Sequence, residues 1–282
     1  GISRSNAEAI VVSAQPSLAI SLRREENESL IPIGSTKVGG SPDLPLGTAW
    51  PCAEGVELRF IAQVDLAQAS ALMPFDQLPR DGLLSFFWCQ EHGVGMEPAG
   101  VRVLHTPRER VLERIPDPWA TRPQRLGLFS KLLGKRPSAR GQGFWPCHVE
   151  MAVKLSLPDS FGPFATKAKL TDEEFDLVFG GGLEKELAAA GVLLEGHRLL
   201  GAPGPIQGAV EYDAESDSRD RPANDPAESA RLAAQWRLIL QMNADHAPGF
   251  SFGDWGAIYF VMRETDLRER RWDRARVVTQ CH

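Results

Sequence analysis

The stretch "LRFIAQVDL", residues 58–66, recurs near the other end of the chain as "WRLILQMNA", residues 236–244. Apolar side chains occupy every second position of the first stretch, and this alternation is typical of a β-strand with one buried face. The second stretch repeats the residues of the opposite face: an arginine, an isoleucine, a glutamine and then an acid or its amide, at the same spacing. A strand pattern that recurs in two distant places predicts two related β-rich halves.

Two further blocks recur in the same order. "GLLSFFW" at 82–88 matches "GAIYFVM" at 256–262, and "KVGGSP" at 37–42 has a looser match in "RLLGAP" at 198–203. Preserved order is what a duplicated unit produces, so the blocks predict an internal duplication. We therefore expect an α+β fold, predominantly antiparallel β, in which two β-rich halves are joined by a helical and loop-rich middle.

The expected domain organisation follows from the positions of these blocks. Residues 1–282 are expected to form a single compact domain, with a first β-rich repeat at 30–100 and a second at 196–282. Residues 101–195 are expected to hold an inserted basic loop and a helical middle.

Helix starts are predicted at two places. Thr171 and Glu174 have the spacing of a capping box, and Asp225 stands before Pro226 as an N-cap stands before a proline at the first helical position. The acidic run at 211–225 has almost no apolar side chains, and it predicts an exposed loop.

Composition sets the broad class of the protein. The chain has 43% apolar and 24% charged residues, which is ordinary for a globular protein. No run approaches the roughly 18 apolar residues that a membrane-spanning helix needs, so no membrane span is predicted. The four cysteines are widely spaced and form no C-x-x-C pair, which favours reduced thiols in a cytoplasm. Because the chain starts at Gly1 rather than Met, a trimmed N-terminal signal stays open.

Charge is unevenly distributed along the chain. The formal net charge is −6, but residues 102–140 contain ten Arg or Lys and three Asp or Glu, so they carry about +7 and the remainder about −13. An acidic chain disfavours nucleic acid as a partner.

The repeated blocks resemble one known family. In the first half the matching residues are Lys37, Gly39, Gly40, Pro42, Leu44, Pro45, Gly47, Trp50, Pro51, Phe60, Ile61, Gln63, Gly82, Leu83 and Phe86. Later matches are "HRLLGAPGPIQG", "LILQMNAD", "GDWGAIYFVMRETDL" and the ending "QC". At these positions the sequence is similar to the YwqG-like proteins, a bacterial family of unknown function. The resemblance spans about residues 30–282 without much of the basic stretch, and it departs at His282, where the family tends to have an aromatic residue. It implies a duplicated, predominantly β protein and supplies no reaction.

Two features of the repeats suggest a binding site. Gly39 and Gly40 allow a rigid loop of exposed amides near Lys37, which either binds an anion or only turns the chain, and the turn is favoured. Gln63 and Gln241 either line a cleft between the halves or hydrogen-bond the buried backbone of the two Gly-Pro loops, and the second is favoured because buried backbone needs partners.

The function expected from these features is that of a non-catalytic module that binds a small ligand or an unknown protein partner. An immunity-type protein is one variant, motivated by the acidic charge. The ligand site is expected in the groove between the halves, because clefts at such boundaries commonly hold ligands. Its candidate residues are Lys37, Gly39, Gly40, Gln63, Gln207, Gln241 and Asp254.

An enzyme is the alternative. It would be a hydrolase with its active site in the cleft between the two repeats, using His197 or His246 with Asp254. No catalytic residue, metal or cofactor is predicted for the favoured binding function, because no nucleophile elbow or zinc motif occurs.

Overall fold

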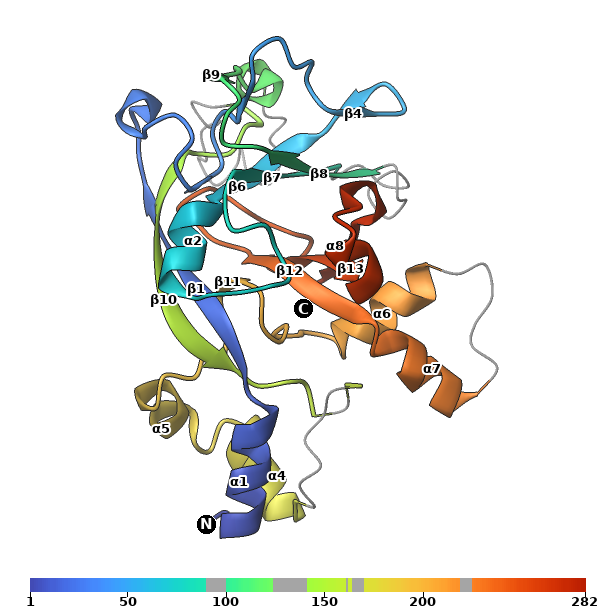
Figure 1. Ribbon diagram of the computed structural model, residues 1–282. Helices are drawn as coiled ribbons and strands as arrows, with labels where there is room; N and C mark the ends of the chain where they lie inside the picture. The colour runs from blue at the N-terminus through green and yellow to red at the C-terminus, as the bar shows by residue number, and fades with distance from the viewer. Residues whose placement is uncertain (90–99, 124–140, 161, 164–169, 219–224) are drawn as a thin grey trace, which may run out of the picture.

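The computed structural model has an α+β fold built on one large antiparallel sheet (Figure 1). It describes residues 1–89, 100–123, 141–160, 162–163, 170–218 and 225–282. The predicted class, α+β with predominantly antiparallel strands, is confirmed. Much of the basic stretch, residues 124–140, lies outside the described residues.

Within the described residues the large sheet has ten strands, in the order β14-β13-β12-β11-β1-β10-β2-β6-β7-β8. Their bounds are β1 (Gln15–Arg24), β2 (Lys37–Val38), β6 (Arg59–Asp65), β7 (Leu83–Trp88), β8 (Val101–Thr106), β10 (Cys147–Ser156), β11 (His197–Leu199), β12 (Trp236–Asn243), β13 (Ala257–Arg263) and β14 (Arg276–Gln280). Two short strand pairs lie outside it, namely β3 (Asp43–Pro45) with β9 (Leu112–Arg114), and β4 (Cys52–Ala53) with β5 (Val56–Glu57).

Strands β1 and β10 form the middle of the sheet. They pair over ten residues, from Gln15 opposite Ser156 to Arg24 opposite Cys147. On one side of this central pair lie β11, β12, β13 and β14, and on the other side β2, β6, β7 and β8. Strand β1 comes shortly before β2 in the chain but pairs with β11, whereas β10 comes before β11 but pairs with β2. Strand β1 therefore extends the group of β11 to β14, and strand β10 extends the group of β2, β6, β7 and β8.

The sheet curls so that its two outer groups face each other across the apolar core (Figure 1). The rings of Phe86 in β7 and Phe260 in β13 meet there, with 5.1 Å between their centroids. The expectation that residues 58–66 expose one face of their strand is wrong. Ile61 and Gln63 are fully buried: a register shift between Phe60 and Ala62 brings Ile61 into the main apolar core, and Gln63 bonds to the loop that follows β2.

Helices lie around this sheet (Figure 1). The described residues contain seven α-helices, α1 (Arg4–Ser13), α2 (Leu66–Leu72), α4 (Asp172–Phe179), α5 (Glu184–Ala189), α6 (Val210–Asp217), α7 (Pro226–Ala233) and α8 (Glu264–Arg268). Short 3-10 turns are η1 (Glu28–Leu30), η3 (Pro118–Thr121) and η4 (Trp272–Arg274). Helices α1, α4 and α5 gather at one end of the central strand pair, and α6 and α7 lie beside β12 (Figure 1). Of the helices described, none is long and apolar enough to cross a membrane.

Both predicted helix starts are confirmed. Thr171 caps α4, because its hydroxyl accepts a hydrogen bond from the N–H of Glu174 while the Glu174 carboxylate accepts one from the N–H of Thr171. Asp225 caps α7 by accepting from the N–H of Glu228 at 2.7 Å.

The prediction of an exposed loop at 211–225 is wrong for its first half, because α6 covers residues up to Asp217. Val210 and Ala214, one turn apart, are buried against a small apolar cluster. Glu215 is buried as well, since its carboxylate accepts hydrogen bonds from Trp236 Nε1 and Arg263 Nη2. The residues that follow, 219–224, lie outside the described part of the chain.

Candidate functional site

The Gly-Pro loop after β2 forms a sharp corner, which we call the first corner (residues 37–43). Gly39 and Gly40 both have positive φ angles, 64° and 71°. A Cβ atom on Gly39 would lie 2.2 Å from the carbonyl oxygen of Trp145, so only glycine fits there. At this turn the loop backbone packs directly against the chain that enters β10.

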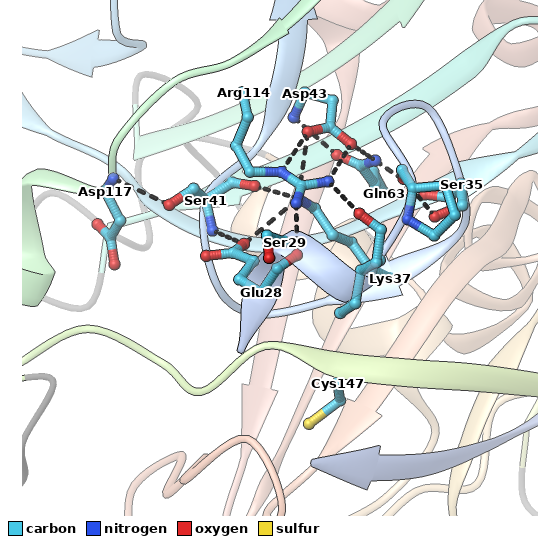
Figure 2. Close-up of polar contacts among 12 residues, drawn as sticks. Glu28, Ser29, Ser35, Lys37, Ser41, Asp43, Gln63, Arg114, Asp117 and Cys147 are labelled. Carbon is cyan, nitrogen blue, oxygen red and sulfur yellow. Dashed lines mark hydrogen bonds and ion pairs between the residues drawn. The ribbon is translucent and has the colours of Figure 1, made fainter. Parts of the chain in front are cut away.

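Lys37 lies at the centre of this corner and is fully buried. Figure 2 shows its ammonium group among the carboxylates of Asp43 and Glu28, at 3.3 and 3.4 Å, and it also donates to the carbonyl of Ser41. Burial lowers the pKa of Lys37, and the charges of Asp43 and Glu28 oppose this effect. Since every charge of the cluster has a partner, Lys37 has no exposed group to offer a ligand.

Asp43 is neutralised from a second direction. Arg114 Nε donates to Asp43 Oδ1 at 2.8 Å (Figure 2). Although burial alone would raise the pKa of Asp43, the hydrogen bond from Arg114 and the charge of Lys37 hold it below its usual value. The carboxylate therefore stays ionised inside the protein.

Gln63 ties the first corner to the sheet. Its side-chain oxygen accepts from the N–H of Asp43 at 2.9 Å, and its Nε2 donates to the carbonyl of Ser35 at 2.8 Å. The expectation that Gln63 hydrogen-bonds the buried loop backbone is confirmed.

A second corner (residues 198–204) has the same internal pattern. Leu200 and Gly201 have positive φ angles, 59° and 81°. Arg198 donates from Nη1 to the carbonyl of Ala202 at 3.0 Å, four residues on, as Lys37 does to Ser41. The Gln241 side chain accepts from the N–H of Gly204 at 2.9 Å, so the second glutamine also bonds its loop as expected.

The two corners differ in charge. The residue six positions after Lys37 is Asp43, whereas the residue six positions after Arg198 is Gly204. Arg198 is 1% exposed, and its Nε has no hydrogen-bond partner. Within the described chain no carboxylate forms an ion pair with it, and burial lowers its pKa to about 10. Arg198 is thus a buried cation with no carboxylate at the sequence spacing that Asp43 has from Lys37.

A cavity of about 550 Å³ lies beside the second corner, and we call it the corner cavity. It is lined by β11, by the loop at 204–206 and by the connection between β12 and β13. Trp255 in that connection is 47% exposed and has a positive φ of 56°, which is a strained conformation for a bulky residue. The cavity is concave, as ligand sites commonly are, and polar and apolar side chains both line it.

His197 forms one wall of the corner cavity, and both of its ring nitrogens are engaged. Nδ1 accepts from the N–H of Asn243 at 3.0 Å, so the proton of the neutral ring is on Nε2, which lies 3.0 Å from Asp245 Oδ2. This hydrogen bond holds the pKa of Asp245 below its usual value. Directly before the first corner, the hydroxyl of Thr36 accepts from the N–H of Asp65, also at 3.0 Å. His197 therefore fills the backbone-bonding position that Thr36 fills in the first half.

The candidate ligand residues from the sequence do not come together in one site. Lys37, Gly39 and Gly40 belong to the first corner, to which Gln63 bonds, and Gln241 bonds to the second. The central strands β1 and β10 lie between β2 and β11, the strands at which the two corners begin. Gln207 is exposed, and its N–H donates to the side chain of Gln280 at 3.3 Å. Asp254 is exposed on the connection before β13.

The pairing proposed for a hydrolase is not the one observed. His197 bonds to Asp245 instead of Asp254, and the ring of His246 packs on Trp255 with 4.6 Å between centroids. Sequence reasoning missed Arg198, Gly204 and Asp245. Extending the match of "KVGGSP" with "RLLGAP" by one residue places Gly204 opposite Asp43, so this difference was visible in the sequence.

Metal chemistry finds no support in the described part of the chain, and Cys147 is not a reactive thiol. The described residues contain no group of three or more His, Cys, Asp or Glu placed to hold a metal ion. Burial raises the pKa of the Cys147 thiol to about 12, which makes it inert at neutral pH. Figure 2 shows this thiol without a contact to the charged cluster of the first corner.

The family model described as "Domain of unknown function (DUF1963)" matches residues 36–281. No curated protein matches the chain.

Proposed function

The chain belongs to the DUF1963 family, for which no function is assigned, and we propose from its geometry that it is a non-catalytic binding protein. Its ligand site is the corner cavity, and its ligand is a small molecule or a side chain of a protein partner. The observation that carries this proposal is the commitment of both His197 nitrogens to structural hydrogen bonds.

A cavity with His197 and Asp245 in its wall could also be an active site. A general base needs a free nitrogen within hydrogen-bond reach of the substrate proton, and His197 has none to offer. The described residues that line the cavity include no Ser, Thr, Cys, Lys or Tyr to act as a nucleophile. The hydrolase alternative is therefore less well supported than binding.

The proposal includes an internal duplication, with first and second repeats at 30–100 and 196–282 in a single domain. The matching hydrogen bonds of the two corners support it, since Lys37 and Gln63 are paired across strands as Arg198 and Gln241 are. On this view the first corner has no room for a ligand, because carboxylates of the protein itself neutralise the charge of Lys37. The second corner is open, because Gly204 replaces the carboxylate and a cavity adjoins it.

We further propose that the protein works in a reducing cytoplasm, and its resemblance to the YwqG-like proteins supports a bacterial source. All four cysteines are free thiols, which supports a reducing compartment. An immunity-type partner stays a prediction, motivated by the acidic charge of the chain outside its basic stretch.

Native mass spectrometry of the protein as purified from its own host tests the proposal. We expect an additional bound mass in the wild type that is lost in Trp255→Ala, because Trp255 is the exposed ring at the cavity mouth. Leu46→Ala is the matched control, since Leu46 is 67% exposed and does not line the cavity. The same bound mass in both variants, or none in the wild type, would contradict a ligand site at the corner cavity.

A further inference from the structure

Arg198 is buried without a counter-ion, directly behind one wall of the corner cavity. We propose that this cavity binds an organic carboxylate, whose charged group lies against Gly204 and supplies the negative charge that Asp43 supplies at the first corner. The inference rests on the proposed binding function and adds the chemical class of the ligand.

The position of Gly204 relates the cavity to the buried cation. A Cβ atom on Gly204 would lie 2.8 Å from Arg198 Nη2 and 3.2 Å from the carbonyl oxygen of Leu194. The free face of Gly204 therefore points toward the guanidinium group. Gly204 and Leu194 both line the cavity, and Leu194 also accepts a hydrogen bond from Arg198 Nη2. Gly204 and Leu194 therefore lie between the cavity and the guanidinium group of Arg198.

Groups within the protein neutralise Arg198 only in part. Its two hydrogen bonds go to the neutral carbonyls of Ala202 and Leu194. Tyr259 lies near but is uncharged, and its hydroxyl donates to the carbonyl of Gly204 at 2.9 Å. Glu195 is the nearby acid, and it is exposed, so water screens its charge. Lys37 at the first corner has two carboxylates within 3.4 Å. An unpaired buried charge is costly, and an anion brought into the cavity would reduce that cost.

The remaining lining of the cavity favours a carboxylate over a phosphate. Asp245 and Glu195 also face the cavity, and they would repel a phosphate more strongly because it carries more negative charge. Both Asp245 oxygens already accept hydrogen bonds, from His197 and from the N–H of Ala247. Apolar surface is supplied by Trp255 and by the side chains of Ile20, Leu194, Pro205 and Ile206. A carboxylate on an apolar body fits this combination.

Titration of the full chain with matched probes tests the ligand class. Phenylacetate supplies a carboxylate on an apolar ring, phenylacetamide is its neutral counterpart, and inorganic phosphate is the alternative anion. At constant ionic strength, we expect saturable shifts of the Gly204 amide signal in ¹H–¹⁵N spectra with phenylacetate. Phenylacetamide should bind about tenfold more weakly or worse, and phosphate should not bind.

Variants at two positions separate charge from shape. Gly204→Asp adds an internal carboxylate beside Arg198, so it should weaken phenylacetate binding by about tenfold or more, whereas Gly204→Ala should weaken it much less. Glu195→Gln removes a repelling charge and should tighten binding by about two- to threefold. Unchanged amide dispersion in each spectrum confirms that the variants fold.

Three results would overturn the carboxylate inference: equal binding of phenylacetate and phenylacetamide, equal effects of Gly204→Asp and Gly204→Ala, or phosphate as the stronger ligand. Absence of any saturable phenylacetate shift would overturn it as well. The proposed binding function would survive each of these results if the native protein still carries a Trp255-dependent bound mass. The two proposals can therefore fail separately.

Discussion

The side chains of His197 and Thr36 each accept a hydrogen bond from a backbone N–H on the neighbouring strand, Asn243 and Asp65 respectively. A histidine in a cavity wall suggests catalysis when it is considered alone. Thr36 makes the same kind of backbone hydrogen bond with a hydroxyl, which has no catalytic partner in this bond. Since imidazole and hydroxyl both provide an acceptor atom, the identity of the residue carries less information than its position.

Substitution of His197 can separate the two roles. His197→Thr and His197→Val leave side chains of nearly equal size, but only threonine can accept from the N–H of Asn243. We expect the valine variant to be about 1–3 kcal/mol less stable than the threonine variant, because it leaves a buried donor without a partner. Urea unfolding at pH 7 measures this difference. Equal stability of the two variants would show that the hydrogen bond from the N–H of Asn243 does not explain why His197 stands at this position.

The sequence predicts these residue-scale features unequally. The roles of Gln63 and Gln241 could be foreseen because buried loop backbone must find partners. The pairing of His197 with Asp245 could not be foreseen. It depends on a turn in which the N–H groups of Gly249 and Phe250 both bond to the carbonyl of Asp245. Pro248 and Gly249 mark a turn in the sequence, but no local pattern shows that this turn places Asp245 beside His197.

At the scale of elements, α6 shows where local pattern fails. Its acidic sequence predicts solvent exposure, but Glu211 and Glu215 are buried. The partners of Glu215 are Trp236 and Arg263, which come from β12 and β13. Capping boxes and the positions of strands are local and could be predicted, whereas burial of the second face of residues 58–66 and of an acidic helix is decided by residues distant in the sequence.

The pH dependence of stability tests the burial of α6. Burial raises the pKa of Glu211 to about 7, with added repulsion from Asp159 and Asp213. The unfolded chain releases this proton near pH 4.5, so the folded state binds it more tightly and loses stability as the pH rises from there through 7. Glu211→Gln cannot ionise, so its stability relative to the wild type should rise by roughly 1–3 kcal/mol between pH 5 and pH 8.

Denaturant titrations at several pH values measure this change. Glu186→Gln on α5 is the control, because Glu186 is exposed, and its difference from the wild type should stay flat with pH. A flat difference for Glu211→Gln as well would show that Glu211 is not buried as described.

At the scale of the whole molecule, the central strands decide how the two halves depend on each other. Repeated blocks in the sequence predict two similar units, which could in principle fold separately. The pairing of β1 with β11 and of β10 with β2 argues against this. Each outer group of strands pairs with the central strand that comes, along the chain, just before the other group. Crossed pairing of this kind cannot be predicted from the blocks, since they contain neither central strand.

Fragments of the chain test this dependence. Residues 1–123 contain β1, β2 and β6 to β8, and residues 141–282 contain β10 to β14. Each fragment alone lacks the ten-residue partner of its central strand and exposes both long edges of that strand, so we expect both to be unfolded in isolation. Mixed in equal amounts, they should assemble and recover the sheet, which circular dichroism and amide spectra would detect. Cooperative unfolding of either fragment by itself would mean that the crossed strands are dispensable, and the single domain expected for residues 1–282 would have to be divided into two.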